Sequence, residues 1–224
     1  MYTGDIMAIE RSEITTRLSA LATSTIANAL DRVDCIGRTM VNLKPVAPGM
    51  RFVGPAVTVR EESGPFGTFR SEDFKVGAMI DAASAGDVIV VAVDGVPYST
   101  WGGMASLAAA TKGVAGIAVD GGARDADETV DAGFNVFTRH LVPTTGRCRL
   151  NIAEIGGTVV VDGVTVSSGD WVVADDTGIL AIPAGIVERV IELSEAFTLE
   201  DEQAANAIRE GLSFSEAMKK FGNI

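Results

Sequence analysis

Short, uninterrupted apolar runs bounded by turn residues constrain this chain more than any other feature of its sequence. Residues 87–94 read DVIVVAVD, residues 113–120 read GVAGIAVD, and a third apolar run covers residues 134–138. Strands buried on both faces have this continuous pattern, whereas half-exposed strands alternate. Helical patterns over residues 101–112 and 125–132 separate the runs, so the sequence predicts parallel βαβ units. Right-handed crossovers then place both helices on one face of the sheet.

The segment before this parallel core predicts helices followed by a strand. The first 35 residues have two helical patterns, and residues 52–60, rich in β-branched side chains, predict a strand. Residues 61–70 contain Gly and Pro and predict a loop. Ser71 and the two acids after it form an N-terminal helix signal, so we expect a helix from Ser71 that stops at Gly86.

The segment after residue 150 changes to closely spaced turns. Glycine-containing turn signals recur every six to nine residues and predict an antiparallel meander, and helical spacing follows Pro183. The predicted fold class is therefore α/β, with a parallel βαβ core, an antiparallel C-terminal meander and terminal helices. We expect residues 1–185 to form one α/β domain and residues 186–224 a helical tail available to pack on a neighbouring subunit.

The composition of this chain excludes some classes of binding partner. Its 224 residues suit one domain, and 30 acidic against 18 basic residues give a net charge of −12, which is unfavourable for binding nucleic acid. The longest apolar run, residues 88–93, is far below the roughly 18 residues that a membrane-spanning helix needs. The first residues lack a basic-then-apolar signal pattern. We therefore expect a cytoplasmic protein that binds neither nucleic acid nor membranes.

The sequence offers few residues for catalysis. It contains one histidine, His140, and two cysteines, Cys35 and Cys148, without a CxxC pair. An HExxH metal site needs two histidines, and the GxSxG, GxxxxGK[ST] and GxGxxG motifs are absent. The chemistry must therefore depend on carboxylates, arginines and backbone amides.

Two predicted strand ends have distinctive residues. Ligands bind beyond the carboxyl ends of parallel strands, where loops and helix N-termini converge. After the first strand, Gly102 and Gly103 open a helix and let an anion approach bare N–H groups, although small residues there also suit helix packing. After the second strand come Arg124 and Asp125, which can hold a carboxylate and a divalent cation. The plainer interpretation is a helix cap at Asp125 and a surface ion pair with Arg124.

These segments in combination resemble a known family. GDVIVVAVDG, WGGMASLAAATKGVAGIAVDGGARD, NVFTR and GGTVVVDGVTVSSGDWVVADDTGILAIP are similar to the regulator of ribonuclease activity A (RraA) family. That family includes 4-hydroxy-4-methyl-2-oxoglutarate aldolases, which also decarboxylate oxaloacetate. The resemblance covers about residues 21–183. It implies a swivelling-type β/β/α layered fold assembled into homotrimers or homohexamers, with the active site between subunits.

The resemblance also implies roles for individual residues. Asp125 would hold Mg²⁺ or Mn²⁺, and Arg124 would bind the 2-oxo acid and act with Asp125 in catalysis. The backbone amides of Gly102, Gly103, Met104 and Ala105 would take the substrate carboxylate. A divalent ion in such a site acts as a Lewis acid that stabilises the enolate formed on C–C cleavage. The leading hypothesis is a divalent-metal lyase that cleaves a small 2-oxo-dicarboxylate to pyruvate by aldol cleavage or decarboxylation.

One residue departs from the family pattern and keeps alternatives open. The family has an acid with twenty residues between it and the Arg-Asp pair, and here that position is Gly103. Asp94, Asp120 or a tail acid such as Glu202 of a neighbouring subunit could supply the missing group. Gly103 favours a non-enzymatic protein-binding regulator instead, and an enzyme acting on another hydroxy or oxo acid is the third hypothesis.

Overall fold

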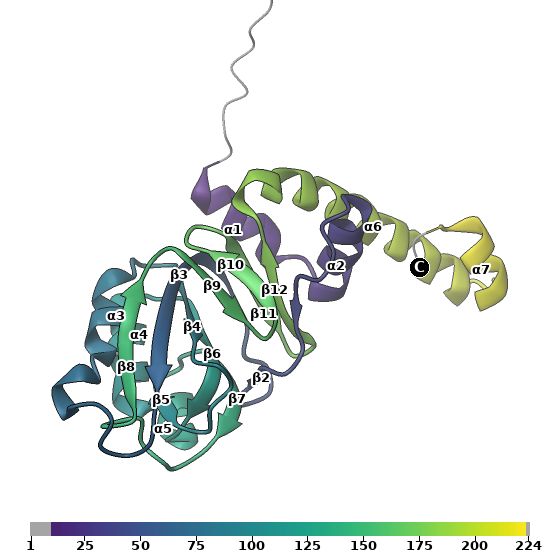
Figure 1. Ribbon diagram of the computed structural model, residues 1–224. Helices are drawn as coiled ribbons and strands as arrows, with labels where there is room; N and C mark the ends of the chain where they lie inside the picture. The colour runs from purple at the N-terminus through teal and green to yellow at the C-terminus, as the bar shows by residue number, and fades with distance from the viewer. Residues whose placement is uncertain (1–9, 223–224) are drawn as a thin grey trace, which may run out of the picture.

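The computed structural model describes residues 10–222, so residues 1–9 of the predicted domain and residues 223–224 of the predicted tail lie outside the described residues. The protein has the expected mixed α/β fold (Figure 1). The α-helices are α1 (Arg11–Ser19), α2 (Thr23–Arg32), α3 (Val76–Ala82), α4 (Gly103–Lys112), α5 (Ala126–Asp131), α6 (Val187–Arg209) and α7 (Phe214–Lys220). The strands are β1 (Thr39–Met40), β2 (Lys44–Pro45), β3 (Phe52–Ser63), β4 (Val88–Ala92), β5 (Ser99–Trp101), β6 (Gly116–Ala123), β7 (Val136–Leu141), β8 (Leu150–Ile155), β9 (Thr158–Val161), β10 (Val164–Ser167), β11 (Trp171–Asp175) and β12 (Gly178–Ile182).

The predicted parallel core is present and lies in the middle of the main sheet. The strand order is β1-β12-β11-β3-β4-β6-β7-β2, and β3, β4, β6 and β7 are mutually parallel neighbours. All five residues of β4 and all eight of β6 are buried, as their continuous apolar sequence predicts. β3 joins two sheet regions: its first residues pair antiparallel with β11, and residues 56–60 pair parallel with β4.

Different layers cover the two faces of this core. On one face, Ile89, Val91 and Ile117 pack with side chains from α3 and α4. On the other face, Val88 and Val90 pack with apolar residues of β9, β10, β11 and β12. Figure 1 shows α3, α4 and α5 on the same side of the sheet, as right-handed crossovers predict. The β/β/α layering expected from the sequence is therefore confirmed.

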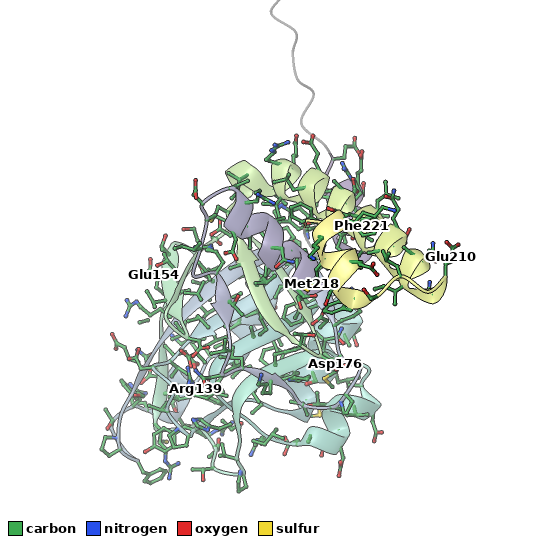
Figure 2. The ribbon with its side chains drawn as sticks, turned by 90° about the vertical axis from the view of Figure 1, so that its right-hand side faces the viewer. Arg139, Glu154, Asp176, Glu210, Met218 and Phe221 are labelled. Atoms are coloured by element: carbon green, nitrogen blue, oxygen red, sulfur yellow. The ribbon has the colours of Figure 1, made fainter. Side chains whose placement is uncertain are left out.

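The terminal helices form a separate group at the far end of the molecule (Figure 1). The first half of α6 packs with α1, α2, β11 and β12 in one apolar cluster that includes Ile26, Ile191 and Phe197. The second half of α6 projects beyond this cluster and pairs with α7, where Phe221 packs on Ala204. Figure 2 shows Met218 and Phe221 on this projecting pair of helices. No helix within the described residues is both long and apolar enough to cross a bilayer.

The predicted helix from Ser71 is wrong in its start. Residues 71–73 form a short 3₁₀ turn (η1), in which the Arg70 N–H donates to the Asp73 side chain, and α3 begins only at Val76. The acidic residues after Ser71 therefore cap this single 3₁₀ turn and not the start of α3. The predicted loop also starts too early, because residues 61–63 continue β3 and pair with β8.

The predicted C-terminal meander is only partly correct. β9 pairs with β10 in a separate two-stranded sheet, whereas β11 pairs with β12 in the main sheet. The turns set each hairpin, but β11 extends the main sheet by pairing with β3, whereas β9 and β10 pair only with each other and pack against the same apolar cluster. The sequence analysis also assigned Trp101 to a helix, whereas it ends the short strand β5. The strand β8 was not predicted.

Candidate functional site

The residues singled out in the sequence come together where β5 and β6 end. Arg124 and Asp125 connect β6 to α5, and Gly102 connects β5 to α4. β5 and β6 are parallel neighbours, so their carboxyl ends lie at the same edge of the sheet. The Arg124 N–H donates to the Trp101 carbonyl over 3.0 Å, which fixes the two junctions relative to each other.

Asp125 has a left-handed backbone conformation, with φ of 55° and ψ of 51°, directly before α5. Asp tolerates this conformation better than most residues, and such backbone is often found at functional sites. Within residues 10–222, its carboxylate bonds to the start of α4 rather than to its own helix: Oδ2 accepts from the Gly103 N–H over 3.2 Å. Arg124 Nε lies 3.4 Å from the same oxygen.

Both glycines at the start of α4 are needed for this close approach. A Cβ on Gly102 would lie 2.6 Å from Asp125 Oδ2 and 3.3 Å from Arg124 Nε. A Cβ on Gly103 would lie 2.0 Å from Glu128 Oε2. Each distance is too short for a side chain, so glycine is required by space. The amides of Met104 and Ala105 follow in the first turn of α4, as the sequence analysis placed them.

Glu128 is the site residue that the sequence analysis missed. It lies on α5, and its carboxylate occupies the space where a side chain at position 103 would begin. A carboxylate carried by another helix therefore lies next to the position where the family pattern has its acid. No local signal in the sequence marks Glu128, because its approach to Gly103 depends on how α5 packs against the start of α4.

A buried polar network holds α4 against α5 below these side chains. The Trp101 indole N–H donates to Ser106 Oγ over 3.0 Å, and Ser106 Oγ lies 3.1 Å from Thr129 Oγ1. Ser106 and Thr129 are buried, and each is one or two residues from the turns that carry Gly103 and Glu128. The separation of the two helices is therefore fixed by hydrogen bonds that solvent does not reach.

A cavity of about 340 Å³ opens beside this junction. Its polar end contains Arg124 and Asp125, and most of its remaining wall is apolar. The apolar lining residues come from α3, α4 and the segment before α3: Phe74, Val76, Ile80, Met104, Ala105 and Ala108. Concave, largely apolar cavities with a few converging polar groups are typical small-molecule sites.

The other acids considered in the sequence analysis lie elsewhere. Asp120 is buried and accepts from Arg139 Nε over 2.6 Å, and Arg139 also donates to Asp162 over 2.7 Å. Asp94 lines a different cavity together with these residues and His140. Burial opposes ionisation of Asp162, but hydrogen bonds from Asn42 and Arg139 outweigh it and lower its pKa. This cluster is an ion-paired support of the fold.

The tail acid and the histidine also have defined positions. Glu202 lies on the second half of α6, at the opposite end of the molecule from α4 and α5 (Figure 1). His140 Nε2 lies 2.9 Å from the Gly95 carbonyl oxygen, so the imidazole supports the loop after β4. Within one subunit, neither side chain lines the cavity that contains Arg124.

Glu61 is a buried acid behind the cavity wall. It is 4% exposed on β3, and the hydroxyl of Thr100, a cavity-lining residue, donates to its Oε2. Within the described residues its Oε1 has no hydrogen-bond partner. Burial raises the pKa of Glu61 to about 7, against the opposing effect of the Thr100 hydrogen bond.

The carboxylates of Asp125 and Glu128 are the oxygen donors nearest the glycine turn. Across residues 10–222, no group of three or more His, Cys, Asp or Glu side chains is arranged to hold a metal ion. Mg²⁺ commonly uses only one or two protein carboxylates and completes its shell with water and substrate. Two hard oxygen donors beside an open cavity fit that chemistry.

Comparisons with known proteins place the chain in a family. The family model described as RraA-like, Aldolase/RraA, matches residues 23–181. A "Putative 4-hydroxy-4-methyl-2-oxoglutarate aldolase" of Halalkalibacterium halodurans is 30% identical over 88% of this chain and 89% of its own length. Protein DlpA of Legionella pneumophila is 27% identical over 88% of this chain, which spans only 32% of that longer protein.

A solved structure has the same fold. Streptomyces coelicolor RraAS2, described as an unusual member of the RNase ES inhibitor RraA protein family, superposes with a TM-score of 0.76. The sequences are 25% identical, and the match covers 89% of this chain and 99% of RraAS2. The family model alone spans well over half of the sequence. The chain belongs to the Aldolase/RraA family.

Proposed function

We propose that this protein is a divalent-metal-dependent lyase that cleaves a carbon–carbon bond of a small 2-oxo acid and releases pyruvate. Relatives named as aldolases support a lyase-like family. The observation that carries the proposal is that Arg124, Asp125 and Glu128 meet at the glycine turn, where Arg124 and Asp125 also line a cavity. Aldol cleavage and decarboxylation both need an anchored carboxylate, charge stabilisation at the 2-oxo oxygen and a proton-transfer group.

Arg124 and the start of α4 are the anchor for the substrate carboxylate. The Arg124 side chain is 46% exposed and lines the cavity, so its guanidinium can reach a ligand. A guanidinium binds a carboxylate through two parallel hydrogen bonds, and the first N–H groups of a helix favour an anion. Because both donors lie at the same glycine turn, they would orient one carboxylate.

Asp125 would hold Mg²⁺ or Mn²⁺. The ion would supply Lewis-acid stabilisation of the negative charge that develops on the 2-oxo oxygen. Asp125 is held by the Gly103 N–H, which keeps its carboxylate at the cavity mouth. The left-handed backbone of Asp125 directs the chain into α5 and thereby places Glu128 over the same turn.

Glu128 is the group we assign to proton transfer. Its carboxylate is solvent-exposed and lies against Gly103, so it can accept the proton of a substrate hydroxyl directly or through one water. In aldol cleavage the hydroxyl on C4 loses this proton, the C3–C4 bond breaks, and C3 is then protonated to give pyruvate. The glycine at position 103 therefore does not remove the acid from the site.

The experiment is pyruvate release from oxaloacetate and 4-hydroxy-4-methyl-2-oxoglutarate, with and without Mg²⁺ or Mn²⁺. We expect Arg124→Ala, Asp125→Ala and Glu128→Ala each to lose at least 100-fold in kcat/KM, the scale of a lost general base or charge-stabilising group. Asp127→Ala is the matched control, because this neighbouring acid on α5 is not among the side chains nearest the glycine turn, whereas Glu128 is. Gly103→Asp combined with Glu128→Gly, which also removes the Glu128 Cβ that lies 2.5 Å from a Cβ at position 103, should recover part of the activity by returning the acid to α4.

A protein-binding regulator remains the alternative outcome. Gly103 was the residue that favoured it, and the position of Glu128 removes that reason. Absence of pyruvate release from every substrate at saturating metal, with no difference between the native protein and its variants, would refute the lyase.

We also propose that the protein is a homotrimer or homohexamer with this site at a subunit boundary. Met104 and Leu107 on α4 are 76% and 52% exposed. Met104 lines the cavity, and Leu107 lies on the same helix. Burying them against another copy would remove apolar surface from water. Light scattering coupled to size exclusion tests this, and a monomeric mass would refute it.

A further inference from the structure

Glu61 lies between the cavity beside Arg124 and a second cavity of the same subunit. We propose that Glu61 and Thr100 form a proton relay, which carries a proton from the second cavity to the cavity beside Arg124 during decarboxylation. The inference rests on the proposed lyase and deepens it, because it gives a role to two residues that the mechanism above leaves unused. It depends only on contacts within one subunit, so it is compatible with a site that a neighbouring subunit completes.

One hydrogen bond connects the two cavities. Thr100 on β5 lines the cavity that contains Arg124 and Asp125, and Glu61 on β3 lines the second cavity. The Thr100 hydroxyl donates to Glu61 Oε2. Both residues are buried, with Thr100 2% and Glu61 4% exposed. The pair is therefore a bridge between the cavities that is itself shielded from solvent.

The second cavity, of about 500 Å³, connects this bridge to water. It lies where β3 and β4 end and is closed on one side by β9, whereas α3 and α4 contribute to the wall of the cavity beside Arg124. Most of the residues that line it are exposed: Arg60, Glu62, Ser63, Asp94, Thr158 and Val160. Glu61 is therefore the residue at which a proton from solvent would enter the bridge.

Glu61 is suited to carry a proton because its surroundings stabilise its negative charge poorly. Within the described residues its Oε1 has no hydrogen-bond partner. Arg60 lines the same cavity, but its guanidinium lies 3.5 Å from the carboxylates of both Glu62 and Glu154. Burial raises the pKa of Glu61 to about 7, so its acid and carboxylate forms are both populated near neutral pH. A group with such a pKa can give up and regain a proton readily at that pH.

Decarboxylation needs a supply of protons, whereas aldol cleavage does not. When the C3–C4 bond of oxaloacetate breaks, C4 leaves as CO₂ and the bonding electron pair stays on C3, which must take up a proton. Every turnover therefore consumes a proton from solvent. In aldol cleavage the C4 hydroxyl releases a proton and C3 takes one up, so Glu128 can return to C3 the proton that it accepted.

The relay is balanced in protons and needs no oxidant or reductant. Protonated Glu61 donates its O–H to Thr100 Oγ1, and Thr100 gives its own hydroxyl proton to the cavity, where C3 or one intervening water accepts it. Thr100 keeps the proton from Glu61 and donates to the resulting carboxylate, which is the hydrogen bond present in the structure. Solvent in the second cavity then reprotonates Glu61 and resets the pair.

The ratio of two activities tests the relay. We would measure kcat for pyruvate release from oxaloacetate, after subtraction of the rate with Mn²⁺ alone, and from 4-hydroxy-4-methyl-2-oxoglutarate. Glu61→Gln and Thr100→Val should each lower the ratio of decarboxylation to aldol cleavage at least tenfold. Thr100→Ser, which restores the hydroxyl, should return the ratio to within about threefold of the native value. A distorted cavity would slow both reactions and would not produce this pattern.

Glu62→Gln is the matched control for the loss of an acid. This neighbouring residue is exposed and lines the second cavity, whereas the Thr100 hydroxyl bonds to Glu61. Its ratio should stay within about twofold of the native value. A ratio within about threefold of native in both Glu61→Gln and Thr100→Val, or an equal fall in Glu62→Gln, would overturn the relay.

Infrared difference spectra separate this inference from the proposed lyase. At about pH 6, below the pKa of Glu61, the native protein should show the C=O band of a protonated carboxyl that Glu61→Gln lacks. Pyruvate added with Mn²⁺ should shift this band in the native protein but not in Thr100→Val. If the band shifts in this way but no substrate yields pyruvate, the lyase fails and the connection between the cavities stands. If aldol cleavage occurs without decarboxylation, or the ratio is unchanged in the variants, the lyase stands and the relay fails. If pyruvate neither forms nor shifts the band, both fail.

Discussion

Replacing the buried Glu61 with glutamine should make the protein more stable above neutral pH. Glu61 is 4% exposed, and burial raises the pKa of its carboxyl to about 7 from an ordinary value of 4.5. The native state therefore holds a proton that the unfolded chain releases. Because the pKa of Glu61 is raised on folding, the contribution of this carboxyl group to the free energy of unfolding is fully present below pH 4.5. It is lost as the pH rises through 7. Glutamine keeps an acceptor for Thr100 and does not ionise.

The size of the effect follows from the pKa difference. A difference of about 2.5 pH units corresponds to about 3 kcal/mol, at 1.36 kcal/mol per unit. The free energy of unfolding of Glu61→Gln minus that of the native protein should therefore rise by about 3 kcal/mol between pH 4.5 and pH 8. For a domain of this size, that is a shift in Tm on the order of 10 °C.

Urea unfolding at a series of pH values measures this difference directly. Other titrating groups cancel in the subtraction, because they are common to both proteins. Glu62→Gln is the matched control, since this neighbouring side chain is exposed and should give a flat difference. If the Glu61→Gln difference stays within about 0.5 kcal/mol across the range, Glu61 ionises normally and the reasoning from burial is refuted.

Three further substitutions test other parts of the structure. Gly103→Ala should lower kcat/KM for pyruvate release at least tenfold and should also lower Tm, because the new Cβ would lie 2.5 Å from the Glu128 Cβ and α5 would have to shift; unchanged kinetics and an unchanged Tm would contradict this close packing. Arg139→Ala should cost about 3 kcal/mol in urea unfolding, because it leaves its two buried aspartate partners unpaired; a loss below about 1 kcal/mol would count against the ion-paired support. Asp175→Asn should destabilise by about 1–2 kcal/mol at pH 7 by weakening the hydrogen bonds that hold the start of α2. These bonds lower the pKa of Asp175 below its ordinary value of 3.8, although burial opposes this. The difference in unfolding free energy between the native protein and Asp175→Asn should therefore disappear as the pH falls below 3.8 and through the folded-state pKa. A difference that persists at that pH would disprove the assignment.

The parallel core could be predicted because its signal is local and strong. The apolar runs of β4 and β6 are continuous, and both helices between the strands appeared at nearly the expected positions. The family resemblance was confirmed by the family model. The pairing of the C-terminal hairpins could not be predicted, because β11 pairs with the distant strand β3 whereas β9 and β10 pair only with each other. That choice is made by contacts between residues distant in sequence.

The candidate site shows a similar limit. Arg124 and Asp125 could be selected from the sequence because they are adjacent and follow a predicted strand. Glu128 could not, because its role depends on how closely α5 approaches the start of α4. The buried hydrogen bonds of Ser106 and Thr129 set that approach, and neither residue is distinctive in the sequence. The roles of the Gly102–Ala105 amides stay a prediction.

The projecting end of α6 has a consequence for how the protein unfolds. Its cluster with α7 is small, consisting of Ala204, Ala217 and Phe221 with two partly buried neighbours. The first half of α6 belongs instead to the large cluster around α1 and α2. One continuous helix thus spans two regions of very different local stability. Amide protons in its second half should exchange with solvent long before those of its first half, so the helix frays from one end while α3, α4 and α5 stay folded on the sheet.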